Sequence, residues 1–220
     1  MPIREIPLFM DGLYHVYNKS IADFKIFNNE NDYRLILDLI RFYLHDKSPC
    51  TFREFRKICA DAKAKDEFLA SNPSPQCTNL VCYCIMPTHI HLVLKEVRQD
   101  GISNYMRHIL NSYSRYFNIK YERKGPLWEN RFGNVLIKND EQLLHLTRYL
   151  HLNPVTAYLV ENPEDWKYSS FKEYIGSIDS HEKICNFGEY LTLDSTSYEK
   201  FVKENIEYQR QTAISKKFAG

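Results

Sequence analysis

The sequence predicts an α+β fold in which helices pack against an antiparallel sheet. Runs of apolar and β-branched residues that are typical of strands lie at 13–18, 80–95 and 132–138. Apolar residues at the three- and four-residue spacing of a helix cover 29–45, 103–121 and 140–152. Because these elements lack the regular strand–helix alternation of a parallel sheet, an α+β sandwich with an antiparallel sheet is favoured.

The composition indicates a globular protein. The chain has 220 residues, of which 44% are hydrophobic and 26% charged, which provides enough apolar mass for a core. No apolar run approaches the roughly 20 residues of a membrane helix, and the N-terminus lacks the apolar segment of a signal peptide. We therefore expect a cytoplasmic protein without a membrane partner. The cysteines include no Cys-x-x-Cys pair, so free thiols are expected rather than a zinc ribbon or a thioredoxin-type site.

Turn-forming residues and helix caps mark the boundaries between the predicted elements. After the first predicted strand and helix, residues 46–79 are polar and rich in turn-forming prolines, with room for a short helix at 52–69. We interpret 46–79 as an insertion or connecting arm. Gly125 and Pro126 end the helix at 103–121, and Asn139 or Asp140 can cap the helix at 140–152.

Two histidines on the run 80–95 are the first candidate site. In Pro87-Thr88-His89-Ile90-His91, the histidines flank one apolar residue. Side chains two apart on a strand point to the same face, which places these two about 7 Å apart at the backbone. Two imidazoles so placed can share one metal ion. The alternative is a histidine pair that is merely packed or half-exposed on a sheet.

A second polar group lies on the helix 140–152. His145, Tyr149 and Asn153 are spaced by four residues and so form one stripe, with leucines on the neighbouring face. Tyr149 is thus a hydroxyl on a rigid element, one turn before an amide that can bind metal. Each residue also has a plainer interpretation. Tyr149 can be a packing residue, His145 a surface residue, and Asn153 a cap before Pro154, which disfavours helical geometry at 153.

The middle of the chain is basic and aromatic although the net charge is only +1. Between residues 95 and 138 basic residues outnumber acidic ones, and tyrosine, phenylalanine and tryptophan lie among them. Cations that follow phosphates and rings that stack on bases are what a single-stranded nucleic-acid groove needs. The alternative is an amphipathic helix with solvated charges. The candidate DNA-binding residues are Arg107, Arg115, Arg123, Lys124, Trp128 and Arg131.

Taken together, three motifs resemble a known family. They are Tyr83-Cys84-Ile85-Met86-Pro87-Thr88-His89-Ile90-His91-Leu92-Val93, Gly125-Pro126-Leu127-Trp128-Glu129-Asn130-Arg131-Phe132 and Tyr149-Leu150-His151-Leu152-Asn153-Pro154-Val155. In this order they resemble the single-tyrosine HUH transposases, in the IS200-like branch and especially the REP-associated tyrosine transposases. The segments 13–19 and 166–170 resemble that branch too, so the resemblance spans roughly residues 10–176.

The resemblance implies a ferredoxin-like sandwich, with an antiparallel sheet, helices on one face and the histidine motif on a central strand. It implies that Tyr149 is the nucleophile and that His89, His91 and Asn153 hold Mg²⁺ or Mn²⁺. The expected activity is cleavage and rejoining of single-stranded DNA through a 5′-phosphotyrosine link, with recognition of hairpin, REP-like DNA. The protein would be cytoplasmic, and associated with the nucleoid when bound to DNA.

The resemblance also suggests a domain division. Residues 1–176 would form the transposase domain, with 46–79 as an insertion, and 177–220 would be a C-terminal extension. Thr88 stands where the family often has Asn, a change that should leave the histidine ligands intact. A monomer and a homodimer are both compatible with the sequence.

Three other interpretations remain open. One is a host-adopted DNA-binding protein of the same fold that has lost recombination. Another is a zinc metalloprotein that uses His89 and His91 with Cys82 or Cys84. On one regular strand the cysteines would face away from the histidines, although Pro87 can reset that register. The third is another HUH nickase, such as a relaxase or replication initiator.

Overall fold

The computed structural model describes residues 6–45, 48–58, 61–71 and 73–218. Four strands form one sheet in the order β2-β3-β1-β4, and every neighbouring pair is antiparallel. The strands are β1 (Leu13–Lys19), β2 (Thr78–Met86), β3 (His89–Glu96) and β4 (Gly133–Ile137). The predicted α+β class and antiparallel sheet are confirmed, and the histidines lie on β3, an interior strand.

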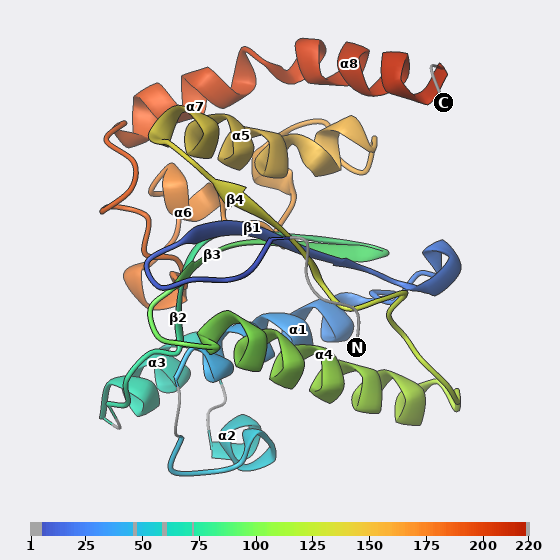
Figure 1. Cartoon of the computed structure of the whole chain (residues 1–220), viewed down its shortest axis with the longest axis vertical. Helices are drawn as coiled ribbons and strands as arrows, with labels where there is room; N and C mark the ends of the chain where they lie inside the picture. The colour runs from blue at the N-terminus through green and yellow to red at the C-terminus, as the bar shows by residue number, and fades with distance from the viewer. Residues whose placement is uncertain (1–5, 46–47, 59–60, 72, 219–220) are drawn as a thin grey trace.

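Helices cover both faces of the sheet, and not one face as predicted (Figure 1). One layer consists of α1 (Glu30–Tyr43) and α4 (Gly101–Lys120). On the other side lie α5 (Asp140–Thr156), α6 (Phe171–Tyr174), α7 (Ser195–Lys203) and α8 (Ile206–Phe218). The short 3₁₀ helices are Ile21–Asp23, Pro163–Asp165 and Ser180–Glu182.

Both faces are covered because the two inner strands are apolar on both sides. On β3, Leu92 and Leu94 contribute to the core under α1 and α4, whereas Val93 contributes to the core under α5. Every residue of β2 is buried. The segment 168–170 also bonds along the outer edge of β2, with the Ile85 N–H donating to the Tyr168 carbonyl at 2.9 Å. This contact covers an edge that would otherwise expose unpaired backbone groups.

The run predicted as one strand at 80–95 is a hairpin of β2 and β3. Its turn falls at Pro87 and Thr88, since proline has no N–H to donate to a ladder. The helix on which Tyr149 lies is also longer than predicted. It continues through Pro154 to Thr156, so the predicted end at residue 152 is wrong and Asn153 is helical although it precedes a proline. The Ala157 N–H donates to the Asn153 carbonyl at 2.9 Å, which keeps the last turn closed.

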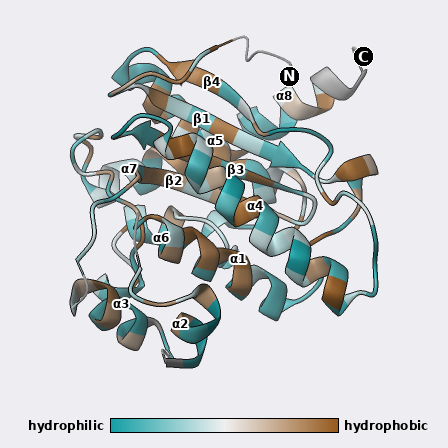
Figure 2. Ribbon diagram, turned by 60° about the horizontal axis from the view of Figure 1, so that its bottom comes forward, coloured by the Kyte–Doolittle hydropathy of each residue, from teal (hydrophilic) through white to brown (hydrophobic). Residues whose placement is uncertain are grey.

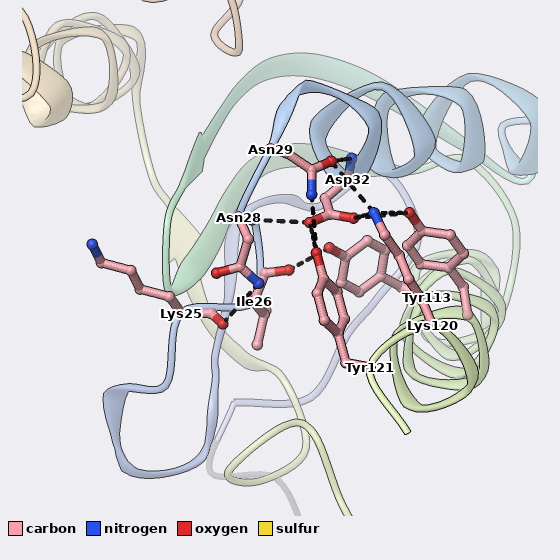
Figure 3. Close-up of polar contacts among 9 residues, drawn as sticks. Lys25, Ile26, Asn28, Asn29, Asp32, Tyr113, Lys120 and Tyr121 are labelled. Atoms are coloured by element: carbon pink, nitrogen blue, oxygen red, sulfur yellow. Dashed lines mark hydrogen bonds and ion pairs between the residues drawn. The ribbon is translucent and has the colours of Figure 1, made fainter. Parts of the chain in front are cut away.

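A buried ionic cluster joins α1 to α4 (Figure 3). The Asp32 side chain is fully buried and accepts hydrogen bonds from Lys120 Nζ at 2.7 Å, Tyr121 Oη at 2.7 Å and Tyr116 Oη at 2.8 Å. Figure 2 shows teal and brown alternating along both helices, as expected for amphipathic helices docked on a sheet. The start of α1 is therefore fixed to the end of α4, on the face opposite α5.

The region predicted as an insertion folds as two helices, α2 (Phe52–Ile58) and α3 (Ala62–Ser71). They form a small core of their own in which Phe55 and Leu69 pack with Phe42 of α1. Lys65 Nζ lies 2.6 Å from the Asp38 carboxylate of α1, which joins α3 to the main layer. No described helix has the length and hydropathy needed to cross a bilayer.

Candidate active site

The two histidines of β3 face α5. His89 and His91 lie on the same side of the sheet as Val93, and their ring centroids are 4.9 Å apart. Both are half-buried. Burial lowers the pKa of His89 and holds the pKa of His91 well below the ordinary range. Both imidazoles are therefore neutral near pH 7, which is the form that can bind a metal ion.

One ring nitrogen of each histidine already has a partner. His91 Nδ1 lies 3.0 Å from Nε2 of His15 on β1, and the two rings are stacked. His89 Nδ1 lies 2.9 Å from the Thr88 hydroxyl. Among the described residues neither Nε2 has a hydrogen-bond partner. If each Nδ1 carries the proton, as metal-bound histidines commonly arrange it, both Nε2 atoms are left free as ligands.

Tyr149 and Asn153 of α5 share a cavity with His89. The cavity has a volume of about 350 Å³ and is lined by Met86, His89, Arg148, Tyr149, Asn153, Thr156, Ala157, Tyr208, Gln209, Thr212 and Ala213. Tyr149 is 44% exposed, whereas Asn153 is 8% exposed. No hydrogen bond of the Asn153 side chain is found within the described part of the chain. The structure thus brings three of the four predicted site residues around one cavity, with His91 next to His89.

Buried contacts hold the Tyr149 helix in place. His151, two residues further on, is completely buried, and its ring nitrogens lie 2.8 Å from Tyr198 Oη of α7 and 2.8 Å from Ser170 Oγ. On the outer side, Gln209 of α8 donates to the Tyr149 carbonyl at 3.1 Å. The C-terminal helices therefore fix the part of α5 that presents the tyrosine.

The cysteines do not complete a metal site. In the hairpin register Cys84 pairs with His91, so the two share a face, and the parity argument that placed them on opposite faces is wrong. Yet burial holds the pKa of the Cys84 thiol well above its ordinary value and raises that of Cys82 to about 12. Both thiols are therefore protonated in the metal-free protein. No group of three His, Cys, Asp or Glu side chains in the described regions could hold a metal ion.

None of the six candidate DNA-binding residues lines the Tyr149 cavity. Arg107 and Arg115 are exposed on α4, across the sheet from Tyr149. Lys124 and Arg131 are exposed and Arg123 is half-buried, all in the connection from α4 to β4. The half-buried Trp128 donates its indole N–H to the Leu110 carbonyl at 3.2 Å and packs against the core.

Two site features were missed in the sequence. His15 lies beside His91, and α8 contributes four residues to the Tyr149 cavity. The alternation in Leu13-Tyr14-His15-Val16 could have indicated that His15 faces away from the Tyr14 side. His145 was placed in one stripe with Tyr149, but it is exposed, contacts Phe201 and does not line the cavity.

Comparisons with known proteins find similarity over the region that contains the candidate site. Residues 57–153 match the family model described as transposase IS200 like. The matched range covers less than half of the chain. All four predicted catalytic and metal-binding residues fall inside the matched range. The match supports the resemblance drawn from the motifs.

Two relatives found by sequence comparison are both named as REP-associated tyrosine transposases. The chain is 36% identical over 104 residues to a REP-associated tyrosine transposase homologue of Haemophilus influenzae, covering 41% of this chain and 57% of that protein. It is 28% identical over 91 residues to the REP-associated tyrosine transposase of Escherichia coli, covering 40% of this chain and 52% of that protein. The chain thus spans about half the length of the curated relatives it matches.

A solved structure shares the fold of this chain. The structure of a REP-associated tyrosine transposase bound to a REP hairpin superposes with a TM-score of 0.53, over 85% of this chain and 93% of that chain. Sequence identity is 15%, so the likeness concerns the fold.

Proposed function

We propose that this protein is a metal-dependent transposase and nuclease that cleaves and rejoins single-stranded DNA through Tyr149. The observation that carries the proposal is that Tyr149, Asn153 and His89 line one cavity, on residues that lie inside the family match. A hydroxyl on a rigid helix next to neutral imidazoles is suited to attack on a phosphodiester.

His89, His91 and Asn153 would hold Mg²⁺ or Mn²⁺. The site fits an ion because both histidines have their Nδ1 atoms engaged and their Nε2 atoms free, and because the buried Asn153 amide lies in the same cavity. A bound ion would polarise the scissile phosphate and offset charge on the leaving 3′ oxygen.

In the proposed step Tyr149 Oη attacks phosphorus. A tyrosine oxygen–phosphorus bond forms while the bond from phosphorus to the 3′ oxygen breaks. The phenol proton is released to solvent and the 3′ oxygen takes up a proton, which gives a 5′-phosphotyrosine link and a free 3′-OH. Burial raises the pKa of Tyr149, so the phenol is protonated at neutral pH before it meets DNA. Attack by another 3′-OH would reverse the step and rejoin DNA, because the phosphodiester energy is kept in the link.

Hairpin DNA of the REP type is the proposed substrate. Support comes from the relatives' names and from α4, which has the exposed Arg107 and Arg115 and no acidic residue over its whole length. Past the end of the helix, the basic surface continues with Arg123, Lys124 and Arg131. Trp128 would hold this connection in place by packing against the core. We also propose that residues 1–176 form the transposase domain and 177–220 an extension.

The test is a denaturing-gel assay for covalent protein–DNA adducts. A labelled single-stranded hairpin from sequence flanking the gene is incubated with the protein in Mn²⁺ or in EDTA. We expect an adduct only with metal, and none from Tyr149→Phe, which lacks only the nucleophilic oxygen. Tyr158→Phe is the matched control, because Tyr158 is 65% exposed just beyond the same helix.

Each outcome decides between interpretations. An adduct that persists in Tyr149→Phe would show that another residue is the nucleophile. A shift on a native gel without any adduct would favour the host-adopted DNA-binding protein. Tightly held stoichiometric zinc in the purified protein would favour the zinc metalloprotein.

A further inference from the structure

Four aromatic rings form a continuous row on the α5 side of the sheet. The ring centroids of His89 and His91 are 4.9 Å apart, those of His91 and His15 are 5.2 Å apart, and those of His15 and Tyr17 are 5.2 Å apart. Tyr17 lies directly across the ladder from His91, with centroids 6.4 Å apart. The row therefore leads from the proposed metal ligands to a tyrosine with no role in the proposed chemistry.

Tyr17 is on an open part of this face. It is 40% exposed, and Val135 on the neighbouring strand is 41% exposed. The core under α5 is built mainly on β2 and β3, together with Ile137 at the far end of β4. The helix therefore leaves the β1–β4 side of the face accessible next to the histidines.

The Tyr17 ring lies across β4 because a glycine makes room for it. Gly133 pairs with Tyr17 across the ladder, and a Cβ added at Gly133 would lie 2.5 Å from the Tyr17 ring. The Tyr17 hydroxyl has no hydrogen-bond partner among the described residues. The ring is thus positioned by packing and by its histidine neighbours rather than by its hydroxyl.

We propose that Tyr17 is a stacking platform for an unpaired nucleobase next to the scissile phosphate. The inference rests on the proposed function, because it takes the phosphate to be held at His89 and His91. A nucleotide anchored there has its neighbouring base within reach of a ring 6.4 Å from His91. Rings on an open sheet face stack on bases of single strands, and they do so with little regard to base identity. The site would add affinity and fix the strand without reading its sequence.

The experiment uses full-length protein in the Tyr149→Phe background, which prevents cleavage. The DNA is the hairpin substrate with 2-aminopurine, a fluorescent base, placed on either side of the cleavage position found on the adduct gel. Stacking on Tyr17 is expected to quench its fluorescence. For Tyr17→Ala we expect the quenching to disappear and Kd to weaken by roughly 5- to 150-fold, the range for loss of one base–aromatic stack.

Three variants separate stacking from folding. Tyr17→Phe keeps the ring and should bind within about twofold of the parent protein. Tyr17→Leu keeps apolar cover over Gly133 but has no ring, so it should behave like Tyr17→Ala even if the alanine variant is unstable. Phe9→Ala removes a ring that is 50% exposed at the other end of β1, and it should change neither signal.

The outcomes distinguish this inference from the proposed function. If the parent chain forms the Tyr149 adduct but Tyr17→Leu keeps both quenching and Kd, the platform is refuted and Tyr17 only covers Gly133. If the chain with Tyr149 intact forms no adduct and binds no hairpin, the proposed function fails and the platform fails with it.

Discussion

Replacement of His15 by phenylalanine should weaken metal binding although His15 is not itself a proposed ligand. His15 Nε2 lies 3.0 Å from His91 Nδ1. If His91 binds the ion through Nε2, its Nδ1 carries the proton and donates a hydrogen bond to His15 Nε2. Burial lowers the pKa of His15 to about 4, so the ring is neutral and can accept at neutral pH. Phenylalanine keeps the stacked ring but removes the acceptor.

The size of the effect follows from the lost hydrogen bond. Removal of the group that orients a metal-bound histidine commonly costs roughly 10- to 100-fold in metal affinity, about 1.4–2.7 kcal/mol. An N–H left without a partner in a buried site costs about 1–3 kcal/mol, which is the same range. We therefore expect the Mn²⁺ dissociation constant to rise by at least about tenfold.

The assay is titration of the DNA-free protein with Mn²⁺, with free ion counted by electron paramagnetic resonance. This readout does not depend on cleavage. His15→Gln retains an acceptor and should recover most of the affinity, while His108→Phe alters an exposed histidine on the other face and should have no effect. If His15→Phe binds Mn²⁺ as tightly as the parent protein, His15 does not orient His91.

Three further predictions concern the scaffold. Leu150→Ala should lower the free energy of unfolding by about 2–5 kcal/mol in urea titrations, because Leu150 is fully buried beside Tyr149; a loss well below that would mean that the α5 core is loosely packed. Burial alone would raise the pKa of Asp32, but hydrogen bonds from Lys120 and Tyr121 lower it overall. Its contribution to stability should therefore be present above the unfolded pKa of about 3.9 and be lost as pH falls through the lower folded pKa. In urea titrations from pH 6 downward, the free energy of unfolding should depend less on pH for Asp32→Asn than for the parent protein. Equal pH dependence in the two proteins would contradict a lowered pKa of Asp32 in the folded state. Gly133→Ala should change the free energy of unfolding by less than about 1 kcal/mol, since the atoms it meets are at the far end of the Tyr17 side chain. It should nevertheless reduce 2-aminopurine quenching, and unchanged quenching would show that the ring position is unimportant.

The fold class and most helices could be predicted because their signals are local. The spacing of apolar residues indicated α1, α4 and α5, and Asn139 does cap α5 by accepting from the Gln142 N–H at 2.8 Å. The β2–β3 turn was missed because the apolar run continues across Pro87 and hides the hairpin. The same error placed Cys84 on the wrong side of the sheet relative to His91.

Which face a helix covers could not be predicted, because it depends on contacts between distant segments. His151 is an example: the motif contains it, but its partners Tyr198 and Ser170 come from 47 and 19 residues away. The contribution of α8 to the Tyr149 cavity is likewise non-local, since Gln209 is 60 residues from Tyr149. The α8 residues that lie beside the tyrosine therefore had no signal in the local pattern.

The two faces of the sheet differ in how completely helices cover them. On β1 the residues facing α1 and α4, such as Tyr14 and Val16, are fully buried, while His15 and Tyr17 on the α5 side are half-buried or exposed. A core that covered both faces completely would bury the histidines and close them to the proposed DNA substrate. Because the first face and the β2 side of the second already supply a continuous core, the β1–β4 side can remain open. The openness beside the histidines is thus a feature that the packing elsewhere makes possible, and it leaves Tyr17 accessible for the proposed base stacking.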